Sequence, residues 1–160
     1  MDIVVGIDPG AGGAIAYSIG DSLKPLVRKM PDSRSALFDF FKEFKSDGKR
    51  GLETKCKFIT EKAMIFPGDG KVSAAKFMLQ YERILCAMEF NELKYTEIHP
   101  TKWQNDLNLR RKKVKGEPKE TKQERKNRYK EFAQRLFPHL KITLQTADAL
   151  LIWYWAKTVK

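Results

Sequence analysis

The two apolar runs that open the chain constrain its fold more than any other feature. Residues 3–7 are apolar without interruption, which is typical of a strand that is buried on both faces of a sheet. A cluster of glycines separates this run from a second one at residues 14–19. Glycines make positive φ angles and close backbone approach easy. We therefore expect a β-hairpin whose first strand is covered by helices on both sides.

The rest of the chain adds one more strand and then alternates helices with strands. Asp32 or Ser33 is expected to cap the first helix, and Pro100 lies near the start of a short one. In chain order, the patterns predict a strand at 25–30, a helix within 31–44, a strand ending at Glu61, a helix at 72–90, a strand at 94–98, a helical turn from 100, a helix ended by Pro138 and a last helix at 146–157. This order predicts an α/β fold in one domain of 160 residues, with a five-stranded mixed sheet flanked by helices on both faces.

Positive charge is concentrated in one part of the chain. The formal net charge is +11, and residues 110–128 alone contain ten Lys or Arg and three Glu. Such a concentration favours a polyanionic partner, although a solvated loop and helix face would give the same pattern. We expect a basic segment at 108–122 that is mobile.

The sequence does not have the marks of a membrane or secreted protein. No window of 18 residues is apolar throughout, and the N-terminus lacks the basic region of a signal peptide. We therefore expect an intracellular protein. The two cysteines, Cys56 and Cys86, are expected to be reduced and packed in the core. A disulfide or a shared metal is the alternative.

Three carboxylates adjoin segments that are expected to be buried. Asp8 ends the first strand, Glu61 ends the fourth, and Asp148 lies in the first turn of the last helix. A buried carboxylate is costly unless a partner compensates it, and a hard divalent cation would do so. If strand four lies beside strand one, the first two acids meet at the carboxyl end of the sheet, where open α/β sheets bind ligands. The last helix can bring the third acid to the same place.

Each acid taken alone also has a purely structural explanation. Asp8, before Pro-Gly, could be an ordinary turn residue. Glu61 could pair with Lys62 or another surface cation. Asp148 could be stabilised by the dipole of its helix. The three acids together, in a chain with a basic segment, favour a metal site.

Three motifs resemble those of RuvC-type Holliday junction resolvases, in the RNase H-like nuclease superfamily. They are "GIDPGAGGAIAY", "FITEKA" and "TADALLIWYW". The middle of the chain, "FPGDGKVSAAKFMLQYERILCAM" and "IHPTKWQNDL", with "AQRLFP", is more similar to the resolvases of phages and large DNA viruses. The resemblance covers nearly the whole chain in the right order. It implies an RNase H-like fold and a cytoplasmic protein of a bacterium or of a virus-infected cell.

The resemblance also implies roles for single residues. Asp8, Glu61 and Asp148 would be the catalytic ligands of Mg²⁺, for which Mn²⁺ can substitute. Lys102 falls where the family often has a lysine near the scissile phosphate, and a cation there could stabilise the transition state. One departure concerns a further acid, which the family usually carries three or four residues before the last one. Those positions hold Gln145 and Leu144.

The same resemblance implies four-way or branched DNA as substrate and a homodimer as the working unit. For DNA binding we expect the lysines of the basic segment to contact phosphates: Lys112, Lys113, Lys115, Lys119 and Lys122. Phe66 could stack on an unpaired base, or could pack into the core beneath its turn. Trp103 is expected to pack its helix onto the sheet. The helix at 72–90 is the candidate dimer interface, although such apolar stripes are more often core.

Three functions are therefore open from the sequence. The first is a metal-dependent endonuclease, a crossover junction endodeoxyribonuclease, that resolves Holliday junctions by paired symmetrical nicks. The second is a non-catalytic protein that binds branched DNA, which the missing fourth acid favours. The third is a nucleotide-binding fragment related to sugar kinases and actin. The short chain, without a second phosphate loop, disfavours this third reading.

Overall fold

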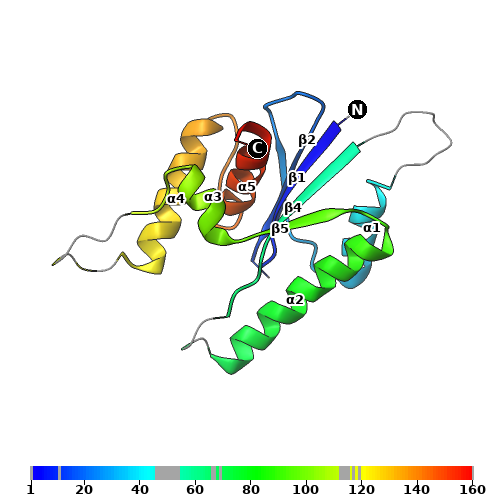
Figure 1. The fold of residues 1–160 in the computed structure, drawn as a ribbon, viewed down its shortest axis with the longest axis horizontal. Helices are drawn as coiled ribbons and strands as arrows, with labels where there is room; N and C mark the ends of the chain where they lie inside the picture. Colours follow the sequence, from blue (N-terminus) through cyan, green and yellow to red (C-terminus); the bar gives the residue numbers. More distant parts are fainter. Residues whose placement is uncertain are drawn as a thin grey trace.

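The computed structural model describes most of the chain, and Figure 1 shows its arrangement. The described residues are 2–10, 12–45, 55–65, 68, 70–111, 116, 118 and 120–159. The strands are β1 (Asp2–Asp8), β2 (Ala14–Ile19), β3 (Leu26–Lys29), β4 (Lys55–Glu61) and β5 (Tyr95–Ile98). The helices are α1 (Arg34–Lys42), α2 (Lys71–Phe90), α3 (Pro100–Asp106), α4 (Lys122–Leu136) and α5 (Ala147–Thr158). The predicted order of strands and helices is confirmed.

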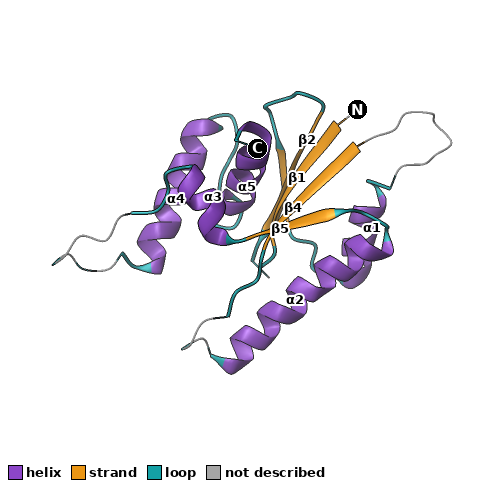
Figure 2. Cartoon of the chain, viewed as in Figure 1, coloured by secondary structure: helices purple, strands orange, loops and turns teal. Residues whose placement is uncertain are grey.

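The five strands form one mixed sheet in the order β3-β2-β1-β4-β5. The β1–β2 and β2–β3 pairs are antiparallel, whereas β1–β4 and β4–β5 are parallel. The sheet lies between two groups of helices, with α1 and α2 on one side and α3, α4 and α5 on the other (Figure 2). The predicted five-stranded mixed sheet with helices on both faces is confirmed, and β4 lies beside β1 as expected.

Alternate residues of β1 belong to the two opposite cores, which explains why residues 3–7 are all apolar. Val5 and Ile7 pack with α1 and α2, whereas Val4 packs with α5. Gly6 also faces α5, because a β-carbon added there would lie 2.4 Å from the backbone nitrogen of Trp153. This parity continues along the strand and sets the direction of the side chain that ends it.

The starts of α1 and α3 follow the predicted capping chemistry, and α4 has a cap that was not predicted. Ser33, rather than Asp32, caps α1, because its hydroxyl accepts a hydrogen bond from the backbone of Ala36. Thr121 and Glu124 form a reciprocal capping box at the start of α4. Pro100 occupies the first turn of α3. These caps fix where α1, α3 and α4 begin.

The glycine link between β1 and β2 uses close backbone approach, one of the two properties for which glycines were expected there. Gly10 and Gly13 do not adopt positive φ angles. Close approach is what Gly13 provides, because a β-carbon there would lie 2.1 Å from the carbonyl oxygen of Asp8. The backbone of Gly13 also donates to the carbonyl of Gly10 at 2.8 Å. The turn is therefore held tightly against the end of β1.

The cysteines are free, and one of them contradicts the expected burial. Cys56 is half-buried, but Cys86 is exposed on α2. The prediction of two core cysteines was wrong for Cys86, because the helical position that it occupies faces solvent. Among the described residues, no helix is both long and apolar enough to cross a membrane.

Candidate active site

Asp8 and Glu61 end two neighbouring parallel strands at the same edge of the sheet. Ile7 of β1 pairs with Thr60 of β4, so the next residue of each strand lies at the same level. Each acid also follows, by two residues, a residue that faces the α5 side: Gly6 in β1 and Ile59 in β4. Because side chains alternate along a strand, both carboxylates are directed to the face that α5 covers.

Asp148 lies in the first turn of α5, on that same face. Its helix packs on β1, and the absence of a side chain at Gly6 allows the backbone of Trp153 to approach the strand closely. Asp148 is 8% exposed. Its Oδ1 atom is buried and has no hydrogen-bond partner. An unpaired oxygen in this position is costly and marks a place where a cation would bind favourably.

The three carboxylates share one electrostatic environment. Burial raises the pKa of Asp8 to about 6, and the negative charge of Asp148 adds to the effect. Burial raises the pKa of Glu61 to about 8, with further increases from Asp8 and Asp148. Like charges raise one another's pKa only at short range. The fold therefore places the three acids that the sequence singled out within electrostatic range of one another, on the face of the sheet that α5 covers.

A lysine that the sequence analysis did not single out contacts this group. The ammonium of Lys126, on α4, lies 2.5 Å from Oδ2 of Asp148. Burial alone would lower the pKa of this lysine, but the charges of Asp148, Asp8 and Glu61 outweigh burial and raise it. The sequence could have shown that Lys126 shares a helix face with the buried Tyr129, three residues on, but not that this face meets Asp148.

Trp103 of α3 holds the second acid in place. Its side chain is fully buried in the core, as the prediction that it packs α3 onto the sheet requires. Its indole N–H also donates to Oε2 of Glu61 at 2.7 Å, a contact that the sequence analysis missed. This hydrogen bond favours the charged form and so lowers the pKa of Glu61 against the larger effect of burial.

Lys102 lies in the same helix but has a different partner. Its ammonium is exposed and donates to Oδ2 of Asp106 at 3.0 Å. The same oxygen accepts the indole N–H of Trp155 at 2.8 Å. Two hydrogen bonds lower the pKa of Asp106, first the one from Trp155 and then the one from Lys102. In this arrangement Lys102 is engaged by Asp106, and its predicted contact with a phosphate stays a prediction.

The expected DNA-binding residues are placed only in part. Lys122 is exposed and begins α4. The other expected contacts lie outside the described residues: Phe66, Lys112, Lys113, Lys115 and Lys119. At the position of the missing fourth acid, Gln145 is exposed and its amide lies beside Gly12, where an added β-carbon would be 3.5 Å from the amide nitrogen. Leu144 is half-buried.

The donor set fits Mg²⁺ or Mn²⁺ in its chemistry. Carboxylate oxygens are the ligands that these cations prefer, and Asp148 offers one that is buried and unpaired. In the described part of the chain, no three Asp, Glu, His or Cys side chains stand close enough to form a complete metal-binding group. Ligation by all three acids therefore requires their side chains to move.

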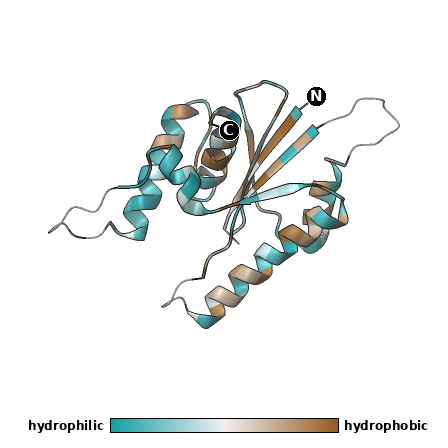
Figure 3. Cartoon of the chain, viewed as in Figure 1, coloured by the Kyte–Doolittle hydropathy of each residue, from teal (hydrophilic) through white to brown (hydrophobic). Residues whose placement is uncertain are grey.

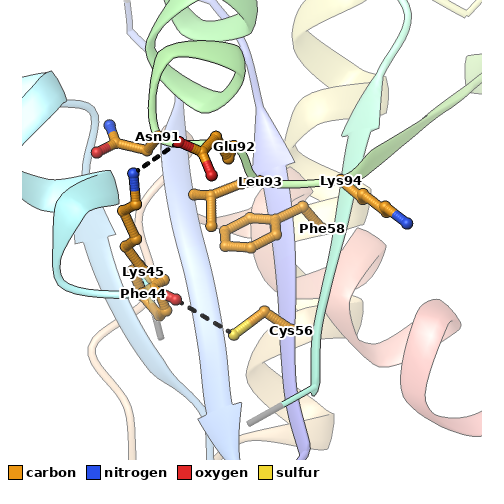
Figure 4. Close-up of a pocket in the computed structure, with 8 residues that line it drawn as sticks. All are labelled: Phe44, Lys45, Cys56, Phe58, Asn91, Glu92, Leu93 and Lys94. Carbon is orange, nitrogen blue, oxygen red and sulfur yellow. Dashed lines mark hydrogen bonds and ion pairs between the residues drawn. The ribbon is translucent and has the colours of Figure 1, made fainter. Parts of the chain in front are cut away.

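A separate cavity lies at the opposite end of β4. Its volume is about 300 Å³, and it is lined by Phe44, Lys45, Cys56, Phe58, Asn91, Glu92, Leu93 and Lys94 (Figure 4). Lys45 and Glu92 form an ion pair across it at 3.0 Å. The thiol of Cys56 donates to the carbonyl of Phe44 at 3.8 Å. None of the candidate catalytic residues lines this cavity.

Among the comparisons with known proteins, the one with solved structures found matches. No protein-family profile matches the chain, and no curated sequence matches it either. Solved structures do. The chain is similar to RuvC of Thermus thermophilus in complex with a Holliday junction substrate, with a TM-score of 0.55 and 15% identity over 97% of this chain and 95% of that one. A second structure of T. thermophilus RuvC gives the same TM-score and identity, over 98% and 96%. The predicted RNase H-like fold is thereby confirmed.

Proposed function

We propose that the chain is a divalent-metal-dependent endonuclease that resolves four-way DNA junctions by paired symmetrical nicks. The observation that carries the proposal is that Asp8 and Glu61 end neighbouring parallel strands of an RNase H-like sheet and face α5, where Asp148 is buried; burial raises the pKa of Asp8 to about 6 and that of Glu61 to about 8. Acids perturbed by burial and by one another are typical of functional sites. The similarity to a structure bound to a Holliday junction supports the substrate.

The residues of the site have distinct tasks in this proposal. Asp8, Glu61 and Asp148 would hold Mg²⁺ or Mn²⁺. The bound metal would activate water and stabilise the leaving oxygen of a phosphodiester. Trp103 keeps Glu61 oriented through its indole N–H. Lys126 and Lys102 supply positive charge that a phosphate arriving at the site could use.

The DNA would follow the basic side of α4. This helix is hydrophilic over most of its length (Figure 3), and Lys122 and Arg125 are exposed on it. Together with the predicted contacts at residues 112, 113, 115 and 119, these side chains would neutralise phosphates in a way that weakens with salt. Phe66 remains the predicted stacking residue.

A homodimer would place two such sites on opposed strands of the junction. The candidate interface is α2, which exposes Val72, Leu79 and Phe90, 68%, 50% and 74% exposed. Their spacing of seven and eleven residues puts them on one face of the helix, and the exposed Cys86 lies on that face too. Two copies of one apolar stripe can pair around a two-fold axis.

We further infer that the chain is more similar to phage and viral resolvases than to bacterial ones, on its middle motifs alone.

Labelled junctions incubated with Mg²⁺ or Mn²⁺ test the proposal. We expect paired symmetrical nicks from the wild-type protein and at least a 100-fold lower rate from Asp8→Asn, as removal of one strong electrostatic contributor commonly gives. Asp2→Asn is the matched control, because Asp2 lies exposed at the other end of the same strand. A linear duplex of the same sequence should not be cut in pairs.

The alternative function is a non-catalytic protein that binds branched DNA. The observation in its favour is Gln145, which stands where the family usually has an acid. Tight junction binding without nicking in any divalent metal would support this alternative over the nuclease. Binding of ATP with no affinity for DNA would contradict both and favour the nucleotide-binding reading.

A further inference from the structure

Lys126 is placed where a cation is needed among the three acids. Its ammonium lies 2.5 Å from Oδ2 of Asp148, and both side chains are mostly buried, at 29% and 12% exposure. It also interacts electrostatically with Asp8 and Glu61. In the described residues it is the cation that approaches Asp148 this closely. The carboxylate group is thus partly neutralised by the protein itself.

The fold delivers this lysine on a rigid element. The capping box of Thr121 and Glu124 starts α4 less than two turns before Lys126. On the same helix, Tyr129 and Ala133 are buried in the core that contains α5. The packing of α4 against α5 therefore places the backbone of Lys126 near the first turn of α5, within reach of Asp148.

We propose that Lys126 is a built-in counter-ion that occupies the cation position in the metal-free protein and competes with the divalent metal for Asp148. This inference rests on the proposed metal site of the nuclease. The ammonium on Oδ2 of Asp148 repels a divalent cation, so it is expected to move away as the metal binds, whereas the unpaired Oδ1 offers the metal its first contact. Lys126 therefore lowers the affinity of the site for a metal, and it stabilises the buried carboxylates when no metal is bound.

The first test is metal binding without DNA. Mn²⁺ affinity is measured by titration calorimetry or by the electron paramagnetic resonance of free Mn²⁺, for the wild-type protein, Lys126→Met and Lys130→Met. Lys130 is exposed one turn further along α4, so its variant removes the same charge away from Asp148. We expect Lys126→Met to bind Mn²⁺ about tenfold more tightly, because the metal no longer displaces a partly buried ion pair. Lys130→Met should match the wild type.

A second measurement uses only the wild-type protein, so that it does not depend on how a variant folds. An amine-reactive acylating reagent labels lysines, and mass spectrometry quantifies each site. Saturating Mn²⁺ should increase labelling of Lys126 several-fold as the ammonium is released, with Lys130 unchanged. Unchanged or reduced labelling of Lys126 would overturn the inference, as would equal or weaker Mn²⁺ binding by Lys126→Met.

The outcomes separate this inference from the proposed function. Tighter Mn²⁺ binding by Lys126→Met in a protein that never nicks junctions supports the counter-ion and contradicts the nuclease. If the wild type nicks junctions but Lys126→Met binds Mn²⁺ with the same affinity as the wild type, the nuclease is supported and the counter-ion is contradicted. No Mn²⁺ binding by either protein overturns the inference and the metal-dependent proposal together.

Discussion

At the scale of single residues, Glu61 is the acid whose surroundings are least favourable to charge. Burial is the largest cause of its raised pKa, and the neighbouring carboxylate of Asp8 is the next. The hydrogen bond from Trp103 opposes both but does not cancel them. A site of this kind holds its acids ready for a cation, because the same burial that disfavours a bare carboxylate strengthens its attraction to a metal.

The pKa of Glu61 predicts how stability depends on pH. A carboxyl whose pKa is higher in the folded chain stabilises the fold below its ordinary pKa, and this contribution is lost as the pH rises through the folded value. For Glu61 the window runs from 4.5 to about 8. We expect the Tm of the metal-free protein to fall across this window, and the fall to be smaller in Glu61→Gln, whose amide oxygen can still accept from Trp103.

Thermal unfolding followed by circular dichroism at several pH values checks this prediction. Glu43→Gln is the matched control, because Glu43 is an exposed acid at the end of α1. Saturating Mg²⁺ should remove most of the fall in the wild type, since a bound metal favours the charged carboxylate. If the Tm of Glu61→Gln depends on pH as that of the wild type does, the raised pKa of Glu61 is not the cause of the fall.

Gln145 is uncharged at a position where a carboxylate would add a fourth negative charge to the site. Its amide lies beside the turn that follows Asp8, so Gln145→Glu would restore a fourth carboxylate near the other three. We expect Mn²⁺ affinity to rise by about tenfold. Gln80→Glu makes the same chemical change on α2, across the sheet, and should have no effect. Calorimetric titration measures both, and equal affinities for the two variants would contradict the expectation.

At the scale of secondary-structure elements, the approach of α5 to β1 decides where Asp148 lies. Gly6→Ala would place a β-carbon 2.4 Å from the backbone nitrogen of Trp153, and that backbone cannot move without shifting the helix. We expect a loss of about 1–3 kcal/mol in the free energy of unfolding, typical of overpacking, together with weaker Mn²⁺ binding because Asp148 moves with α5.

Urea denaturation of the glycine variants measures the loss. Gly12→Ala is the control, because a β-carbon there meets only the end of the Gln145 side chain at 3.5 Å. Its stability should stay within about 0.5 kcal/mol of the wild type. If Gly6→Ala were as stable as Gly12→Ala, close packing of α5 on β1 would not be what positions the acid.

Much of the fold was predictable because its signals are local. The uninterrupted apolar residues of β1 require cover on both faces, and the cap at Ser33 and the proline at Pro100 mark helix starts within a residue or two. The convergence of Asp8 and Glu61 also followed from the sequence once β4 was expected beside β1. Which of the two properties the glycine turn uses did not follow from the sequence, because close approach and positive φ call for the same residue type.

The contacts of the lysines depend on packing between elements, and local patterns do not contain that information. Lys126 was one of ten basic residues at 110–128, and only the docking of α4 on α5 brings it to Asp148. Lys102 was favoured by resemblance, yet its partner in the fold is Asp106, one turn further along α3. In the same way, Cys86 is exposed because of which face of α2 meets the sheet.

At the scale of the whole molecule, the account predicts a dimer that forms through α2. Leu79 is half-exposed in the apolar stripe of that helix, and a charge placed there would be buried without a partner. We expect Leu79→Lys to be monomeric in light scattering coupled to gel filtration, whereas the wild type is dimeric. Leu23→Lys is the control, since Leu23 is 60% exposed between β2 and β3. A dimer that tolerates Leu79→Lys would place the interface elsewhere.

Anomalous diffraction from crystals grown with Mn²⁺ shows whether Asp8, Glu61 and Asp148 form one divalent-metal site. We predict an anomalous peak at the edge of the sheet, within coordinating distance of at least two of the three carboxylates. The peak should be lost in Asp148→Asn. An anomalous peak elsewhere on the chain would contradict this site. The absence of any peak at an Mn²⁺ concentration that saturates a metal-dependent nuclease would contradict it too.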